Sequence, residues 1–400
     1  MSTTRTQVAI VGAGPAGLLL SHLLDRAGID SVLLENRSPD YVLGRIRAGV
    51  LESSSVDLLS EVGLGERIAR EGDEHRGIYL QWTAEGQGER HHLDFVDHVG
   101  RSVWVYGQTE VTKDLMAARE RAGQQSHYEV RDVELHDVAG DRPAVTFTDR
   151  DGTHQRLEAD AVAGCDGFHG PSRAGIPADV RRTWERVYPY AWLGVLAEVA
   201  PSTDELIYAW HPDGFALHSM RSPTVSRLYL QVPPDEDVAQ WPDDRVWEAL
   251  ATRLGHGQDG WTLQDGPIVE KSVLPMRSFV STPMRHGRLF LAGDAAHIVP
   301  PTGAKGLNSA LADVKVLGRA LMEHYRQAQP RWLERYSATC LKRMWLVQRF
   351  SAGLCTMVHQ FPGENPFVRR LQRADLDYMT TTVPGRLQFS ENFTGLPIDA

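Results

Sequence analysis

Three glycines near the start of the chain have the spacing of a phosphate-binding turn. Gly12, Gly14 and Gly17 directly follow an apolar run at 7–11. In such a turn the first glycine permits the tight bend, the second lets a pyrophosphate approach the backbone, and the third lets helix and strand pack closely. The helix that follows offers free N–H groups and the positive end of its dipole to phosphates. The spacing therefore predicts a dinucleotide site.

The residues around these glycines predict the β-α-β unit that would hold them. Residues 7–11 indicate a buried strand, leucines at helical spacing continue to Gly28, and residues 31–35 indicate a second strand. Glu35 ends that strand, where a carboxylate can accept hydrogen bonds from a ribose diol. The alternative is an ordinary tight turn with Glu35 as a solvated strand end. Strand, glycines, helix and acid nevertheless stand in the order that a dinucleotide site requires.

A second ligand-facing segment lies near residue 300. Asp294 follows a buried run at 288–292, and the glycines of segment 300–308 let backbone N–H groups face a ligand at the start of the next helix. Two such sites at opposite ends of one sheet favour a long dinucleotide with a ring system at its far end, which describes FAD better than NAD. The alternative for Asp294 is an N-cap in an ordinary strand-to-helix turn.

Length, composition and charge narrow the class of protein. The 400 residues, 42% hydrophobic and 24% charged, are typical of a globular protein with two or three packed units. The formal charge of −10 argues against a nucleic-acid binder, and no apolar run predicts a membrane span. A strand pattern begins near the N-terminus, so no signal peptide is expected. The three cysteines, Cys165, Cys340 and Cys355, have no CxxC spacing, which favours a reducing cytoplasm and predicts neither a disulfide scaffold nor a metal site.

The strand and helix patterns predict an α/β protein. It combines a Rossmann-like FAD-binding domain with a parallel sheet, an inserted substrate domain with an antiparallel sheet, and a helical C-terminal region. Residues 1–75, 100–185 and 276–330 are assigned to the discontinuous FAD-binding domain, with short alternating strands expected between 75 and 150. Residues 76–99 and 186–275 are assigned to the substrate-binding sheet, and 331–400 to the helical region.

The chain resembles the group A flavoprotein aromatic hydroxylases over nearly its whole length. Besides the glycine fingerprint, which many folds share, three segments carry the resemblance: Tyr41–Val50, Gly164–Gly170 and Ala292–Asn308. The resemblance implies hydroxylation of 4-hydroxybenzoate to 3,4-dihydroxybenzoate, with FAD as cofactor, NADPH as co-substrate and O2 as oxidant, through a flavin C4a-hydroperoxide. It also implies a homodimer formed through the helical C-terminal region.

The resemblance assigns cofactor roles to residues along the chain. Glu35 would bind the adenosine ribose, Asp294 the ribityl chain, and Arg47 with Gln108 the pyrophosphate region. The full set of FAD positions is Gly12, Gly14, Gly17, Glu35, Arg47, Gln108, Asp166, Asp294, Leu307 and Asn308. Positions that would serve the incoming NADPH are Tyr41, Arg45, His169 and Arg277. Asn36 stands where strongly NADPH-selective members carry arginine, so NADH is expected as an alternative donor.

The resemblance also implies a substrate pocket. Arg221, helped by Ser219 and Tyr229, would clamp a carboxylate, because a guanidinium fork fits that geometry. Tyr208 and the carbonyl of Pro301 would hold the phenol, and a hydrogen bond donated to its oxygen would favour the ionised, electron-rich form. Without the resemblance, alternating tyrosine and arginine in a strand would indicate an ordinary sheet surface.

One pocket position departs from the family pattern. Phe393 stands where the family has a tyrosine, and it lacks the hydroxyl that would continue a proton relay from Tyr208 towards His75. Either water replaces that hydroxyl, or the pocket prefers a relative of the substrate, such as 3,4-dihydroxybenzoate or 4-aminobenzoate. A different class of function, a non-catalytic protein that binds flavin or an aromatic acid, also stays open at this point.

Overall fold

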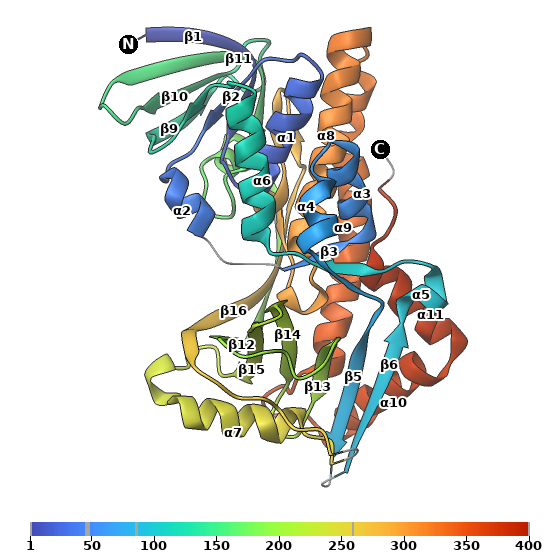
Figure 1. The fold of residues 1–400 in the computed structure, drawn as a ribbon. Coiled ribbons are helices and arrows are strands. Elements are labelled where there is room, and N and C mark those ends of the chain that lie inside the picture. Colours follow the sequence, from blue (N-terminus) through green and yellow to red (C-terminus); the bar gives the residue numbers. More distant parts are fainter. Residues whose placement is uncertain (1, 45–48, 85–86, 258–259, 399–400) are drawn as a thin grey trace.

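The computed structural model describes residues 2–44, 49–84, 87–257 and 260–398. Within these residues the chain forms two large sheets, one small sheet between them, and helices that cover their faces (Figure 1). No helix of these residues is long and apolar enough to cross a membrane. The predicted fold class, a parallel cofactor sheet joined to a largely antiparallel sheet and a helical C-terminal region, is confirmed.

The first sheet is built on parallel strands that begin with the predicted β-α-β unit. Its main path is β17 (Arg285–His286), β18 (Leu289–Leu291), β11 (His154–Gly164), β1 (Ser2–Val11), β2 (Ser31–Leu34) and β8 (Ser126–His127). All pairs from β18 to β8 are parallel, while β10 (Ala144–Thr148) and β9 (Arg131–His136) add an antiparallel branch beside β11. Covering helices are α1 (Pro15–Arg26), α6 (Gln108–Arg121) and α8 (Gly306–Gln327).

The second sheet separates two apolar cores. Its order is β19 (His297–Ile298), β16 (Ile268–Thr282), β12 (Arg182–Ala197), β15 (Val225–Val232), β14 (Ala216–Ser222), β13 (Leu206–Trp210), β5 (Gly77–Ala84) and β6 (Gln87–Asp94). Alternate residues of β13 face opposite sides, as strand geometry requires. Tyr208 faces the C-terminal helices, whereas Ile207 and Ala209 pack with α7 (Asp243–Leu254).

A small third sheet lies between the two large sheets, and several short helices complete the fold (Figure 1). The sheet pairs β3 (Val50–Glu52) and β4 (Asp73–His75) antiparallel with β7 (Val103–Val105). The short helices are α2 (Pro39–Gly44), α3 (Ser53–Glu61), α4 (Gly65–Glu71) and α5 (Phe95–Val99), with 3-10 turns η1 (Ser172–Gly175), η2 (Val238–Gln240), η3 (Gly293–Ala295) and η4 (Pro301–Gly303).

The C-terminal helices connect both halves of the molecule. They are α9 (Arg331–Val358), α10 (Pro366–Thr381) and α11 (Val383–Thr394). α9 contacts α8 at one end and the second sheet at the other (Figure 1). Asn365 caps α10 and Thr382 caps α11, each through a side-chain oxygen that accepts a backbone N–H. α11 packs against α10, α5 and strand β6 of the second sheet.

Two features of the secondary structure differ from the expectation. Short strands occur between residues 75 and 150 as expected, but the same region also contains α6, whose charged sequence hides its few buried positions. The second sheet is also not purely antiparallel, because β13 pairs in parallel with β5 from a distant part of the chain. The domain boundaries stay predictions, and residues 186 and 275 fall inside β12 and β16, which run together between the two halves.

Candidate active site

The glycine turn is shaped by close backbone approaches. A Cβ on Gly12, where φ is +107°, would collide with the Cys165 carbonyl, and one on Gly17 would collide with the Gly12 carbonyl. A Cβ on Gly14 would meet nothing within 4 Å. Gly14 is also the N-cap of α1 and provides no side-chain cap to its first N–H groups. The turn therefore presents uncapped donors to open space, as a bound pyrophosphate requires.

Glu35 supports this turn directly. Its Oε2 accepts the Ala13 N–H at 2.7 Å and its Oε1 accepts the Arg37 N–H at 2.9 Å. The carboxylate thus fixes the loop beside the place predicted for a ribose. Each oxygen keeps a second lone pair, so this support is compatible with a further hydrogen bond.

The predicted far end of the cofactor site lies where α1, β18 and α8 meet. Gly293 has φ of +62°, and its N–H donates to Asp313 Oδ2 at 3.0 Å. The same oxygen lies 2.6 Å from His297 Nε2. Asp313 and His297 thereby hold the turn that presents Asp294. Neither was singled out from the sequence, although His297 belongs to the matched segment.

Leu307 and Asn308 lie in the first turn of α8. The Asn308 side chain accepts the Glu52 N–H at 2.9 Å and donates to the Val50 carbonyl at 3.0 Å. These bonds tie the start of α8 to β3. α8 has no side-chain N-cap, and nothing lies within 4 Å of the place where a Cβ of Gly306 would stand.

Asp166 lies beside the Gly12 turn, and Gln108 begins a helix. Asp166 Oδ2 accepts the Ser172 N–H at 2.8 Å, while Oδ1 is buried and has no partner among the described residues. Burial raises the pKa of Asp166. Gln108 is the first residue of α6, after the N-cap Gly107. An orphaned buried oxygen and the starts of α1, α6 and α8, none of which has a side-chain cap, fit a polar cofactor.

The predicted NAD(P)H positions are only partly brought together. His169 and Arg277 both lie beside the Phe168 ring, at 5.0 Å between ring centroids and 4.9 Å from the guanidinium carbon to the centroid. Arg277 also pairs with Glu185 at 3.4 Å. Tyr41, exposed on α2, packs with Arg37 instead. Arg45 and Arg47 lie outside the described residues.

The substrate residues share one face of the second sheet. Strand register places Tyr208 beside Leu217, and Leu217 beside Tyr229. Ser219 follows Leu217 by two positions, so its side chain leaves the same face. Arg221 lies where the pairing of β14 with β15 shifts register, and its Nη2 lies 3.5 Å from the Tyr229 hydroxyl. A face that the sequence alone would have indicated as ordinary surface is therefore turned inward, because the C-terminal helices cover it.

Arg221 is a partly buried cation that has no anionic partner among the described residues. Its Nη1 donates to the Met220 carbonyl at 3.0 Å, and its Nη2 lies 3.5 Å from the Tyr229 hydroxyl. Its Nε is buried and makes no hydrogen bond within the described chain. Burial lowers the pKa of Arg221. Burying a charged guanidinium without an anionic partner costs free energy. Arg221 is therefore suited to receive the carboxylate of a ligand.

Two further predicted contact groups are engaged within the protein. The Ser219 hydroxyl donates to the Arg227 carbonyl at 2.6 Å. The Pro301 carbonyl accepts the Ala304 N–H at 2.9 Å. A hydroxyl oxygen and a carbonyl oxygen each keep a free lone pair, so both can still accept from a ligand.

Tyr208 and Phe393 meet in the core of this site. Their ring centroids lie 6.0 Å apart, nearly perpendicular, and Phe393 also packs against Phe95 at 5.1 Å. Both side chains are buried, and burial raises the pKa of Tyr208. Phe393 offers no polar atom beside Tyr208 and packs within a wall of aromatic rings.

A buried ion cluster beneath Phe393 was not predicted. Lys305 Nζ donates to Glu52 at 2.7 Å and to the Phe393 carbonyl at 2.8 Å, and Arg343 reaches Glu52 at 3.0 Å. Burial lowers the pKa of Lys305, against the opposing effect of Glu52. The cluster joins the N-cap residue of α8, β3, α9 and the end of α11. The presence of Lys305 within the glycine-rich segment was the available signal, but its partners are remote in sequence.

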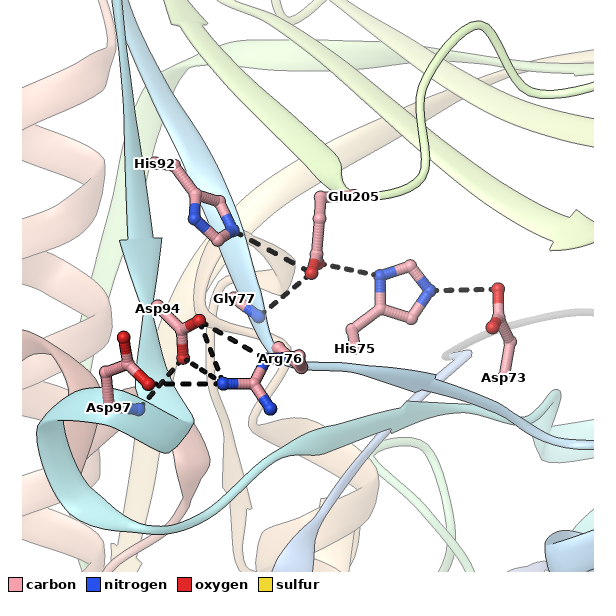
Figure 2. Close-up of polar contacts among 8 residues, drawn as sticks. All are labelled: Asp73, His75, Arg76, Gly77, His92, Asp94, Asp97 and Glu205. Atoms are coloured by element: carbon pink, nitrogen blue, oxygen red, sulfur yellow. Dashed lines mark hydrogen bonds and ion pairs between the residues drawn. The ribbon is translucent and has the colours of Figure 1, made fainter.

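His75 lies apart from these rings in polar contacts. Its Nδ1 lies 3.0 Å from Glu205 and its Nε2 lies 3.1 Å from Asp73, as Figure 2 shows. The structure therefore brings Tyr208 and Phe393 together, whereas the polar partners of His75 are carboxylates. No group of three or more His, Cys, Asp or Glu side chains in the described ranges could hold a metal ion.

Comparisons with known proteins decide the family. The family described as "FAD binding domain" matches residues 5–351. The p-hydroxybenzoate hydroxylase of Acinetobacter baylyi is 50% identical over 399 residues, which cover 100% of this chain and 97% of that protein. This chain belongs to the group A flavoprotein hydroxylases. It is thus an FAD-dependent enzyme of aromatic hydroxylation, and the alternative of a non-catalytic binding protein is set aside.

More distant relatives agree on the family and the fold. A probable NADH-specific resorcinol 4-hydroxylase of Rhodococcus jostii is 27% identical, over 78% of this chain and 57% of that protein. The crystal structure of p-nitrophenol 4-monooxygenase from Pseudomonas putida superposes with a TM-score of 0.82 at 20% identity and covers both chains fully. The latter likeness shows that this flavoprotein hydroxylase has the fold of a known monooxygenase. The predicted family, fold and FAD cofactor are confirmed.

Proposed function

We propose that the chain hydroxylates 4-hydroxybenzoate at carbon 3, giving 3,4-dihydroxybenzoate with consumption of NAD(P)H and O2. The observation that carries this proposal is Arg221, a partly buried guanidinium with an unpartnered Nε and no carboxylate at ion-pair distance in the described chain. An aromatic acid would provide the missing anion. The name of the 50% identical relative, p-hydroxybenzoate hydroxylase, supports the same substrate.

The protein residues then have distinct roles in this reaction. Arg221, Ser219 and Tyr229 bind and orient the carboxylate. Tyr208 and the Pro301 carbonyl hold the phenol, and a hydrogen bond that favours the phenolate makes the ring more electron-rich at the carbon beside it. FAD, when bound, accepts hydride from NAD(P)H and activates O2. The apolar wall around Phe393 limits the contact of the reacting ring with bulk solvent.

The cofactor roles are proposed on the geometry of the glycine turn and the α8 start. Gly12, Gly14 and Gly17 would receive the pyrophosphate, Glu35 the adenosine ribose and Asp294 the ribityl chain. Further FAD contacts are proposed for Arg47, Gln108, Asp166, Leu307 and Asn308. NAD(P)H contacts are proposed for Tyr41, Arg45, His169 and Arg277. Because Asn36 offers no cation to a 2′-phosphate, we expect both NADPH and NADH to serve.

Phe393 bears on which aromatic acid is hydroxylated by this chemistry. Without a hydroxyl beside Tyr208, the proposed relay to His75 lacks a member, which water replaces when 4-hydroxybenzoate is the substrate. The alternative is a substrate that brings its own polar group, 3,4-dihydroxybenzoate or 4-aminobenzoate. Arg221 would bind the carboxylate of all three.

Turnover with identified products tests this proposal. Purified enzyme is mixed with FAD, NADPH or NADH, and each of the three acids, and the products are separated by chromatography. We expect 3,4-dihydroxybenzoate in near-stoichiometric amount to the NAD(P)H consumed. NAD(P)H oxidation that yields peroxide with 4-hydroxybenzoate, but hydroxylated product from a rival acid, would move the assignment to that rival.

Assembly and location are proposed from the exposed apolar side chains and from the cysteines. A homodimer is proposed because exposed apolar side chains remain on the C-terminal helices, including Trp345, Leu346, Phe367 and Tyr378. Light scattering would measure its mass. A cytoplasmic location is proposed because Cys165, Cys340 and Cys355 are all free and buried. Cell fractionation would test it.

A further inference from the structure

Glu205 is the meeting point of several polar groups at the edge of the substrate sheet. Its Oε2 lies 3.0 Å from His75 Nδ1, and its Oε1 accepts the Gly77 N–H at 3.1 Å and lies 3.8 Å from His92 Nε2. The Glu205 side chain is 13% exposed and that of His75 only 1%. Figure 2 shows the carboxylate between the two imidazoles. None of the roles assigned so far uses this residue.

The contacts of His75 require a charged ring. A neutral imidazole has one N–H, whereas carboxylates only accept, so contacts to Glu205 and Asp73 on both nitrogens are satisfied only by the imidazolium. Burial lowers the pKa of His75, but the two carboxylates oppose it and the net shift is upward. The other ionisable neighbours in Figure 2 are His92 and Arg76, and Arg76 is already paired with Asp94 and Asp97.

This charged group joins three strands near Tyr208. His75 ends β4, Gly77 begins β5, and Glu205 directly precedes β13. β5 and β13 then run in parallel, with Leu206 beside Ile78 and Tyr208 beside Leu80. Contacts of Glu205 therefore act on the beginning of β13, and Tyr208 follows Glu205 by only three residues.

We propose that Glu205 is a positioning residue whose ion pair with protonated His75 fixes β13, and with it Tyr208. The inference rests on the proposed function of Tyr208 as the phenol-binding residue. The sign of its pH dependence follows from linkage. A histidine with a folded pKa above its unfolded value stabilises the fold below the unfolded pKa, and this contribution is lost as pH rises through the folded pKa. The Tyr208 strand is therefore expected to loosen on the alkaline side.

Glu205→Gln is the main test, because glutamine keeps the acceptor for the Gly77 N–H and removes the charge. The His75 ring is titrated by NMR, with its signal assigned through His75→Gln. We expect its pKa to fall by about one unit or more in Glu205→Gln. Glu74→Gln is the matched control, since Glu74 neighbours His75 in β4 but accepts from Ser102, and it should leave the titration unchanged. Asp73→Asn should give a smaller shift, because Asp73 is exposed.

A second signal reports on Tyr208 without any substrate. In enzyme with carbon-13 at the tyrosine ring carbon that bears the hydroxyl, the Tyr208 signal, assigned through Tyr208→Phe, should follow the His75 titration. In Glu205→Gln the Tyr208 signal should no longer change as His75 titrates. The Kd for 4-hydroxybenzoate at neutral pH should rise about tenfold in this variant. An unchanged His75 titration in Glu205→Gln, or a Tyr208 signal that ignores His75 in the wild type, would overturn the proposal.

The two proposals fail separately. Should Glu205→Gln not fold, the wild-type Tyr208 signal decides, because it must move with His75. If both ring signals behave as expected while 4-hydroxybenzoate does not bind to the wild type, the positioning role stands and the proposed substrate is wrong.

Discussion

The cofactor end and the substrate end of this enzyme are built in different ways. At the cofactor end, short contiguous segments provide the proposed binding groups from the backbone. Gly12, Gly14 and Gly17 shape a turn whose N–H groups face open space. At the substrate end, side chains from distant strands and helices meet, as Arg221, Tyr229 and Phe393 do. A backbone site tolerates almost no added atom, whereas a side-chain site depends on charge and on strand register.

The largest expected effect separates two glycines of the same turn. Gly17→Ala places a Cβ on the Gly12 carbonyl, so we expect a loss of about 3 kcal/mol or more in unfolding free energy. Gly14→Ala meets nothing in the protein and should leave the FAD-free enzyme as stable as the wild type. Its FAD affinity should fall at least about tenfold, because the backbone is then screened from the pyrophosphate. Urea unfolding and flavin titration measure both. A destabilised Gly14→Ala enzyme with normal FAD affinity would contradict the claim that Gly14 serves cofactor binding and Gly17 serves packing.

The next effect belongs to the substrate end. Arg221→Gln should weaken 4-hydroxybenzoate binding by about 100-fold, or about 3 kcal/mol, because a charge-assisted carboxylate contact is lost. FAD affinity should stay unchanged. Arg245→Gln is the matched control, since Arg245 packs over Trp241 beside α7, on the opposite face of the sheet. Equal weakening in both variants would argue against a specific carboxylate receptor.

Acid should weaken the core of the substrate end through His359. Trp192 donates to its Nε2 at 2.7 Å, so that nitrogen must stay unprotonated, and burial lowers the pKa of His359 to about 3. A folded pKa below the unfolded value near 6.5 means that stability present above pH 6.5 is lost progressively as pH falls towards the folded pKa. From pH 7 to 5 this group should cost about 2 kcal/mol.

His359→Gln keeps a polar side chain and removes the titration. We expect this variant to be less stable at pH 7 but to lose about 2 kcal/mol less than the wild type between pH 7 and 5. Urea unfolding at the two pH values measures the difference. Identical acid losses in the two proteins would mean that another group controls the acid limb.

The smallest effect concerns the departure from the family pattern. Phe393→Tyr adds a hydroxyl to a wall of aromatic rings, which should cost about 1 kcal/mol in stability. If water serves the relay in the wild type, the variant should convert more NAD(P)H into product while the ranking of the three acids stays the same. A changed ranking would assign substrate choice to Phe393.

The same contrast explains how much was predictable from the sequence. The β1–α1–β2 unit and its glycines were predicted because each signal lies within about 30 residues and obeys one local rule. α6 was missed, because its few buried positions are dispersed among charges. The parallel pairing of β13 with β5 joins residues more than 120 positions apart, and no local pattern encodes it.

The site shows the same limit. Arg221, Ser219 and Tyr229 were named through a family resemblance, whereas their strand pattern alone indicated an exposed surface. The Lys305–Glu52–Arg343 cluster and the Glu205–His75 pair were not foreseen, since the first joins charges from three separate segments and the second from two segments about 130 residues apart. Such clusters depend on tertiary burial, which decides whether a charge is solvated or must find a partner.

A double-mutant cycle between protein and ligand tests the central claim most directly. The Kd values of 4-hydroxybenzoate and of 4-hydroxybenzamide, which lacks the carboxylate charge, are measured for the wild type and for Arg221→Gln. If Arg221 is the carboxylate receptor, the wild type should prefer the acid by about 100-fold and the variant by no more than about threefold. An undiminished preference for the acid in Arg221→Gln would contradict the proposed site.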